Sequence, residues 1–252
     1  MSKVLITGAT EGIGLSFAKY YSSIGDEVYL VARNRMRMID VKKQLEDTYH
    51  NKVYMIIQDL SVVGTASQLY ESVNDEIDIL INNAGVGYTE RSWKIDIDKE
   101  ESMVVLNDAT LMSLTKLYAN DMKKRHSGMI INIASTGAFQ PGPYIAGYYA
   151  SKSFVVSYTR ALHEELKQYG IHVYCVCPGP VDTDFYLKSG TNSPRYAMNP
   201  DKVVKYTIKH MKKKCMIIPG FLNRFVRIFP ESIRMYFVKK SKWKKIQKKK
   251  NS

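Results

Sequence analysis

The chain has 252 residues, a mass of 28.8 kDa and a composition of 45% hydrophobic and 24% charged residues. This mixture can bury one large core, which excludes wholesale disorder, collagen-like repeats and a coiled coil. The net charge of +13 comes from residues 202–252, which hold 17 Lys and Arg and one acidic residue, whereas residues 1–201 carry a net charge of −3. Because the body is slightly acidic, we expect no nucleic-acid partner.

Short β-rich runs alternate with helical periodicity along the chain. The predicted strands are Val4–Thr7, Glu27–Ala32, Val53–Ile57, Ile77–Ile81, Met129–Ile133, Ile171–Cys177 and Cys215–Ile218. The predicted helices are Ile13–Ile24, Met36–Thr48, Thr65–Val73, Lys99–Arg125, Tyr148–Gln168 and Asp201–Met211. Several strands are nearly continuous apolar runs, which is typical of a sheet covered on both faces.

This alternation predicts an α/β fold, a single-domain, Rossmann-like, doubly wound parallel sheet of about seven strands with helices on both faces. We expect this domain over residues 1–219. Residues 220–252 form an amphipathic, basic C-terminal extension, which we do not expect to be an independent domain.

A glycine-rich turn follows the first predicted strand, with the sequence Thr7-Gly8-Ala9-Thr10-Glu11-Gly12-Ile13-Gly14. Gly8 allows a tight turn, Gly12 lets the backbone approach a diphosphate, and Gly14 lets the helix pack closely on the strand. The G-x3-G-x-G spacing differs from the G-x-G-x-x-G fingerprint and is a weak signal alone. At the first strand-to-helix junction, however, it predicts a dinucleotide site at a helix N-terminus.

The end of the second predicted strand bears on the choice of cofactor. An acidic residue there would bind a ribose 2′-hydroxyl and repel a 2′-phosphate. This chain has Ala32 followed by Arg33, Asn34 and Arg35. Two guanidinium groups suit phosphate binding, so we expect NADP(H) in preference to NAD(H). The alternative is that these residues only begin a solvated helix.

Further motifs follow in order along the chain: Asp59-Leu60, Asn82-Asn83-Ala84-Gly85, Asn107, Ser135, Tyr148-x-x-x-Lys152 and Pro178-Gly179-Pro180-Val181-Asp182-Thr183. With the glycine turn, they make the chain resemble the short-chain dehydrogenase/reductase family from residue 3 to residue 190. The resemblance implies a catalytic tetrad of Asn107, Ser135, Tyr148 and Lys152.

The same resemblance implies the cofactor contacts. Asp59 would cap the adenine, Asn83 would lie against the adenosine, and Thr183 would supply a hydroxyl at the nicotinamide. The remaining implied cofactor residues are Gly8, Thr10, Glu11, Gly12, Ile13, Gly14, Arg33, Asn34, Leu60, Ala84, Gly85, Tyr148, Lys152, Pro178, Gly179 and Val181.

Tyr148 and Lys152 are four residues apart and so share one face of a predicted helix. An ammonium about 4 Å from the phenol would favour the phenolate by roughly 4 kcal/mol. If little desolvation opposes it, the Tyr148 pKa would fall by about three units, to about 7. Ser135 can donate a hydrogen bond to a substrate oxygen. A lone Tyr-x3-Lys pair is usually a surface pair, and the nearby Tyr144 and Tyr149 have no lysine four residues on.

Asn107 lies inside the predicted helix Lys99–Arg125. A buried amide without partners is costly. We therefore expect Asn107 to open a local kink or to hold a water that links Lys152 to solvent.

The C-terminal extension combines apolar residues with a dense run of lysines. Phe221, Leu222, Phe225, Ile228 and Phe229 recur at steps of three and four, and eight lysines and a tryptophan lie within 239–250. This pattern is typical of a helix on an anionic bilayer surface and predicts peripheral membrane contact through residues 221–250. Equally, the aromatic face could close a substrate pocket or pack on a partner subunit.

Other features narrow the class of protein. Three cysteines, Cys175, Cys177 and Cys215, are too few for a disulfide framework and lack zinc spacing, so we expect reduced thiols, a cytoplasmic protein and no metal. The N-terminal residues carry no secretion signal, and no 18-residue apolar window predicts a membrane span. A homodimer or another homo-oligomer is expected, although the extension departs from compact family members.

The residues thus predict an NADP(H)-dependent oxidoreductase that interconverts a ketone or aldehyde and an alcohol. Phe139, Tyr144, Phe185 and Tyr186 favour an apolar or lipid-like substrate. Two alternatives remain: a nucleotide-binding protein without turnover, and a membrane or nucleic-acid adaptor that acts through the basic tail.

Overall fold

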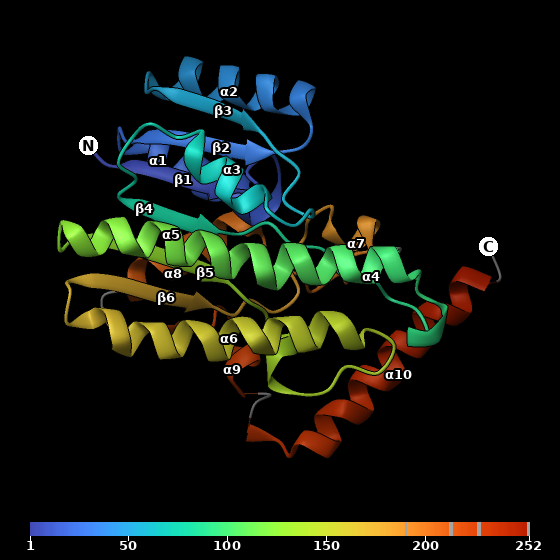
Figure 1. Cartoon of the computed structure of the whole chain (residues 1–252). Helices are drawn as coiled ribbons and strands as arrows, with labels where there is room; N and C mark the ends of the chain where they lie inside the picture. Colours follow the sequence, from blue (N-terminus) through green and yellow to red (C-terminus); the bar gives the residue numbers. More distant parts are fainter. Residues whose placement is uncertain (190, 212–213, 226–227, 251–252) are drawn as a thin grey trace.

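The computed structural model describes residues 1–189, 191–211, 214–225 and 228–250. Of these, residues 248–250 are described by their backbone alone. Within them, seven strands form one parallel sheet in the order β3-β2-β1-β4-β5-β6-β7 (Figure 1). The strands are β1 (Lys3–Thr7), β2 (Glu27–Ala32), β3 (Val53–Ile57), β4 (Ile79–Asn82), β5 (Gly128–Ile133), β6 (Ile171–Val176) and β7 (Met216–Ile217). The predicted parallel sheet is confirmed, with bounds that shift by one or two residues.

Helices cover both faces of the sheet, as predicted. One face is covered by α1 (Gly12–Ser23), α2 (Arg35–Tyr49) and α8 (Pro200–Met211), and the other by α3 (Thr65–Glu71), α5 (Leu111–Lys124) and α6 (Ala146–Lys167) (Figure 1). A hydrophobic core lies on each face of the sheet, and alternate residues of each strand point into one core or the other. Val4 and Ile6 of β1 pack with α1, whereas Leu5 packs with α5 and α3.

The predicted helix Lys99–Arg125 is interrupted at Asn107, where a local kink was one of two expectations, and it begins two residues earlier than predicted, at Ile97. The segment consists of α4 (Ile97–Val104), the π-helical turn η2 (Val105–Thr110) and α5. Asn107 lies in this wide turn, where its side chain bonds to neighbouring segments. Hydrophobic periodicity tracks only the buried side and cannot reveal one extra residue in a turn.

The carboxyl ends of the strands lie at one edge of the sheet, where the connecting loops and two short helices gather. These helices are the 3-10 turn η3 (Thr136–Phe139) after β5 and α7 (Phe185–Lys188) after β6; a further 3-10 turn, η1 (Ser92–Lys94), precedes α4. In doubly wound sheets, ligands bind at this edge.

The C-terminal extension forms α9 (Phe221–Phe225) and α10 (Glu231–Lys250). In Figure 1, α10 runs across the side of the molecule toward which the strands point. Its second half packs on the body, with Ile246 only 2% exposed, whereas Phe221 and Phe237 are 72% and 63% exposed. No helix in the described ranges is both long enough and apolar enough to cross a bilayer.

Candidate active site

The glycine turn places the N-terminus of α1 against a cavity of about 500 Å³. A Cβ at Gly14 would lie 2.2 Å from the carbonyl oxygen of Gly8, so only glycine lets α1 pack this closely on the turn. Gly12 has φ of +54°, and a Cβ there would lie 2.7 Å from Thr183 Cγ2. Glu11 precedes α1 but its side chain does not cap the helix. The first N–H groups of α1 are therefore open to an anion.

Thr7, which was not among the predicted site residues, fixes this turn to the neighbouring strand. Its Oγ1 accepts hydrogen bonds from the backbone N–H groups of Asn83 and Ala84, both at 3.0 Å. The Asn83 side-chain amide donates to the carbonyl of Thr7 at 2.9 Å. Asn83, which was predicted to lie against the adenosine, thus also joins its loop to the glycine turn. A hydroxyl at the end of a strand before a glycine turn is the only signal that could have indicated Thr7.

At the α2 end of the cavity, the prediction that Arg33 and Arg35 act together is wrong. Arg33, Asn34 and Arg37 line the cavity, and Arg35 does not. The Arg33 guanidinium lies 3.5 Å from the Asp59 carboxylate. Asn34 Oδ1 accepts the N–H of Arg37 at 3.0 Å and so caps α2. Arg35 and Arg37 both lie on α2, which begins at Arg35. Successive side chains of a helix are rotated by about 100°, so Arg37 points in a different direction from Arg35.

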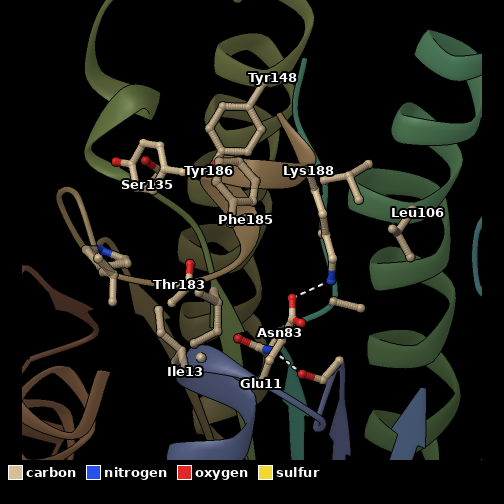
Figure 2. A pocket seen from close by; sticks show the side chains of 18 of the residues that line it. Glu11, Ile13, Asn83, Leu106, Ser135, Tyr148, Thr183, Phe185, Tyr186 and Lys188 are labelled. Carbon is tan, nitrogen blue, oxygen red and sulfur yellow. Dashed lines mark hydrogen bonds and ion pairs between the residues drawn. The ribbon is translucent and has the colours of Figure 1, made fainter. Parts of the chain in front are cut away.

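A cluster of four charged side chains joins α2 and α7 across the start of α1. Arg37 lies 2.8 Å from Glu11 and 3.0 Å from Asp184, and Lys188 bonds to the second oxygen of Glu11 (Figure 2). Arg37 holds the pKa of Asp184 below its usual range through their hydrogen bond. These contacts fix α7 beside the glycine turn.

Three of the four predicted tetrad residues, Ser135, Tyr148 and Lys152, come together at the other end of the cavity. Ser135 is the residue before η3, and its Oγ accepts the N–H of Gly137 at 3.0 Å and also bonds to the Tyr148 hydroxyl. Lys152 is 4% exposed, and its Nζ donates to the carbonyl of Ile133 at 2.9 Å. The Lys152 Nζ lies 5.8 Å from the centroid of the Tyr148 ring.

The expected fall of the Tyr148 pKa to about 7 is wrong for this structure. Burial raises the pKa of Tyr148 above its usual value, and the hydrogen bond with Ser135 offsets only part of that rise. Burial also lowers the pKa of Lys152 to about 8, against the attraction of Asp108. The Coulomb argument treated the ammonium alone, whereas desolvation opposes both charged forms.

Asn107 is fully buried and joins η2 to two other segments. Its amide nitrogen donates to the carbonyl of Val86 at 2.9 Å and to Ser151 Oγ at 3.0 Å, and its Oδ1 accepts the N–H of Val86 at 3.0 Å. Asn107 does not line the cavity. A Cβ at Gly85 would lie 3.1 Å from Asn107 Oδ1 and 3.4 Å from Lys152 Nζ, which places both groups directly behind this glycine.

Most predicted residues line the one cavity. They are Gly8, Thr10, Glu11, Gly12, Ile13, Arg33, Asn34, Asp59, Leu60, Asn83, Ala84, Gly85, Ser135, Tyr148, Lys152, Pro178, Gly179, Val181 and Thr183. Of the four residues expected to make an apolar substrate region, Phe185 and Tyr186 line the cavity, and Phe139 and Tyr144 do not. Tyr144 instead packs against Trp243 of α10, at 5.4 Å between ring centroids. Sequence reasoning missed Lys242 of the same helix, which does line it.

Comparison with known proteins agrees with this geometry. A family model described as short chain dehydrogenase matches residues 2–193. The chain belongs to the short-chain dehydrogenase family. Members are oxidoreductases that act on CH–OH groups, and the family assignment predicted from the motifs is confirmed.

Two relatives show how far the similarity of this chain extends. The very-long-chain 3-oxoacyl-CoA reductase of Anas platyrhynchos is 32% identical over 188 residues, which cover 71% of this chain and 59% of that protein. An uncharacterized oxidoreductase of Staphylococcus saprophyticus is 32% identical over 182 residues, which cover 71% and 78%. The chain thus spans less than two thirds of the reductase.

Solved structures extend the likeness to most of this chain. A short-chain dehydrogenase from Sphingobium yanoikuyae in complex with NADPH is 27% identical, with a TM-score of 0.84 over 90% of this chain and 92% of that one. A Burkholderia phymatum member in complex with NAD shares the fold, with 20% identity and a TM-score of 0.81 over 90% and 91%.

A nicotinamide dinucleotide fits the residues around the cavity. The uncapped start of α1 lines the cavity at Gly12 and Ile13 and suits a diphosphate. Lys152 and Tyr148 lie at the far end of the same cavity. Among the described residues, no group of three His, Cys, Asp or Glu side chains is arranged to hold a metal ion.

Proposed function

We propose that this chain is an NADP(H)-dependent oxidoreductase that interconverts a ketone or aldehyde and an alcohol, on an apolar or lipid-like substrate. The observation that carries the proposal is that Tyr148, Ser135 and Lys152 share one cavity with the glycine turn of α1. We retain residues 1–219 as the reductase domain and 220–252 as its extension.

In this proposal, the bound cofactor supplies or accepts a hydride, and the chain handles the proton and the substrate oxygen. Ser135 donates a hydrogen bond to that oxygen, and Tyr148 donates the proton in the reducing direction. The raised pKa of Tyr148 keeps its hydroxyl protonated at neutral pH, which suits a proton donor. Lys152 binds the cofactor ribose, and Asn107 positions Gly85 and Ser151 around Lys152.

The preference for NADP(H) rests on the α2 end of the cavity. Arg33 and Arg37 both line it, and Ala32 stands where an acidic residue would repel a 2′-phosphate. Guanidinium groups suit bidentate phosphate binding. We expect NADPH to be oxidised at least about tenfold more efficiently than NADH.

The apolar substrate is supported by the Tyr148 end of the cavity. Val86, Ile145, Tyr149, Phe185 and Tyr186 line it. The similarity to a very-long-chain 3-oxoacyl-CoA reductase favours the same kind of carbonyl compound.

We also propose a cytoplasmic homo-oligomer that contacts membranes through residues 221–250. Exposed apolar side chains on α5 and α6, Met112 and Phe154, are candidates for a subunit contact that light scattering can test. Exposed aromatic residues of α9 and α10 support the membrane contact. Residues 226 and 227 of this segment lie outside the described residues.

The substitution Tyr148→Phe tests the reaction. It removes the proton donor and leaves the ring that packs 5.2 Å from Phe185. We expect carbonyl-dependent NADPH oxidation to fall by at least about a hundredfold. Stabilisation of the protein by NADPH against heat should persist, which shows that the cavity still forms. Undiminished turnover in the variant would refute the mechanism, and NADPH binding without turnover in the wild type would favour a nucleotide-binding protein.

A further inference from the structure

One residue of the C-terminal extension reaches the cavity that holds Tyr148. Among the described residues after Lys188, Lys242 alone lines it. Lys242 lies in the second half of α10, the part that packs on the body. The tail therefore contributes a cation to the site.

Several contacts hold α10 in this position. The Trp243 ring packs against Tyr144, and the Arg91 guanidinium lies 5.2 Å over the Trp243 ring. One turn on, Lys245 Nζ donates to the carbonyl of Asn192 at 3.2 Å and lies 5.0 Å over the Tyr186 ring. The position of Lys242 is thus fixed from both sides.

These contacts place the segment of α10 that carries Lys242 beside the substrate end of the cavity, because Lys245, one turn on, lies over the Tyr186 ring. The Tyr186 ring lies 5.9 Å from the Phe185 ring, which lies 5.2 Å from Tyr148. Figure 2 shows these three rings grouped at the end of the cavity away from Glu11. The arginines proposed to bind the cofactor phosphate come from the opposite end, where α2 begins.

Lys242 has no carboxylate partner in the described part of the chain. None of the ion pairs there involves it, although Arg33, Arg37 and Lys188 around the same cavity are all paired. Burial and the neighbouring Lys245 lower the pKa of Lys242 to about 8, so the ammonium form is disfavoured there without an added anion. An unpaired, half-buried cation that faces a binding cavity is best explained by an anionic ligand.

We propose that Lys242 binds an anionic group of the carbonyl substrate and so determines substrate specificity. The substrate is then an amphipathic carbonyl compound, with an apolar part against Phe185 and Tyr186 and a carboxylate or phosphate at Lys242. This proposal rests on the proposed function, because it assigns the substrate class of the same cavity.

The kinetic test compares charged and neutral carbonyl compounds in two matched pairs. Levulinate and methyl levulinate differ by a carboxylate, and acetoacetyl-CoA and S-acetoacetylpantetheine differ by the phosphate-bearing nucleotide. We expect Lys242→Met to raise KM for the anionic member of one pair about tenfold and to leave its neutral partner and NADPH unchanged. The affected pair identifies the anion. Lys242→Arg should retain most of the affinity, and Lys244→Met, at an exposed position of α10, is the control.

A binding measurement gives a result that does not depend on turnover. In the presence of NADP+, decanoate should raise the Tm of the wild type more than decanol does, and Lys242→Met should abolish that difference. Equal effects of the variant on both members of each pair, a raised KM for NADPH alone, or no advantage of decanoate over decanol would overturn the proposal. A decanoate effect without turnover of any carbonyl would instead refute the proposed function and leave the anion site standing.

Discussion

Burial sets the protonation states of Tyr148, the proposed proton donor, and of Lys152, the residue proposed to bind the cofactor ribose. Tyr148 stays neutral because its phenolate would lose solvation, and Lys152 holds its proton only weakly for the same reason. Asp108 is the carboxylate that favours the Lys152 ammonium, and its Oδ1 has no hydrogen-bond partner in the described part of the protein. Burial raises the pKa of Asp108 to about 6, so it is charged at neutral pH.

The substitution Asp108→Asn should therefore change the pH dependence of carbonyl reduction. Without the negative charge, Lys152 loses its proton at a lower pH. We expect the alkaline fall in kcat/KM to move to lower pH by about one unit. Steady-state kinetics between pH 6 and pH 10 measure the shift, with Asp108→Glu as the matched variant that keeps the charge. An unmoved alkaline limb would show that Asp108 does not act on Lys152.

Lys152 should also affect how the free energy of unfolding depends on pH. Its pKa is about 8 in the folded state and higher in the unfolded chain, so the unfolded chain binds more protons between these values. The free energy of unfolding should gain a favourable contribution of about 2 kcal/mol between pH 8 and pH 10 from this residue. Denaturant titrations of the wild type and Lys152→Met check this.

The sign and size of the contribution from Lys152 distinguish it from the contributions of other titratable groups. Lys242 contributes in the same direction because burial also lowers its pKa to about 8, so the variant should keep part of the slope. Buried tyrosines with raised pKa, such as Tyr21, act in the opposite direction, but only above about pH 10. Identical slopes for the two proteins would be inconsistent with a weakly held proton on Lys152.

At the scale of elements, α10 is attached to the body by Arg234 in its first half, which donates to the carbonyl of Phe139 at 2.7 Å, and by several side chains in its second half. Trp243 contributes an aromatic contact with Tyr144 and a cation–π contact with Arg91. Trp243→Ala should weaken the attachment by about 1–2 kcal/mol, because each contact contributes about 1 kcal/mol. Amide hydrogen exchange in α10 should then be about tenfold faster, with exchange in β1 and β4 unchanged.

Tyr236→Ala provides the control for this prediction. Tyr236 lies on the same helix and is 58% exposed. Its substitution removes an aromatic ring that makes no contact with the body comparable to that of Trp243. Equal exchange rates in the two variants would contradict the assignment of Trp243 as an anchor.

The sequence predicted the elements of the body because their patterns are local. Apolar runs mark strands buried on both faces, and the motif residues follow strand ends that parallel topology brings to one edge. The π-helical form of the kink at Asn107, the exchange of Arg37 for Arg35 and the entry of Lys242 into the cavity depend on helix rotation and on packing between distant segments. The hydrophobic periodicity of one segment gives no information about its contacts with distant segments.

At the scale of the whole molecule, the positive charge and the exposed apolar side chains occur together. Residues 202–252 carry the excess of lysine and arginine, and Phe221, Leu222 and Phe237 are exposed in the same region. We expect binding to vesicles that contain phosphatidylserine and no binding to vesicles of phosphatidylcholine alone. Co-flotation measures this, and about 0.5 M salt should release most of the protein.

Variants at exposed lysines distinguish vesicle binding through the tail from vesicle binding through the body. Lys239→Gln with Lys240→Gln should lower vesicle affinity by about tenfold or more, since each lysine contributes about 1 kcal/mol near such a surface. Lys43→Gln with Lys116→Gln removes the same charge from exposed positions on the body. Equal losses in both pairs would indicate that net charge alone, not the tail, attracts the vesicle.

The course of synthesis follows from the placement of α10. The sheet is complete at Ile217, and the helix that carries Lys242 is translated after it. Because domains generally fold as units and α10 packs on the finished body, the nucleotide crevice can assemble before α10 docks. Nascent molecules would then encounter cofactor before they can discriminate among substrates.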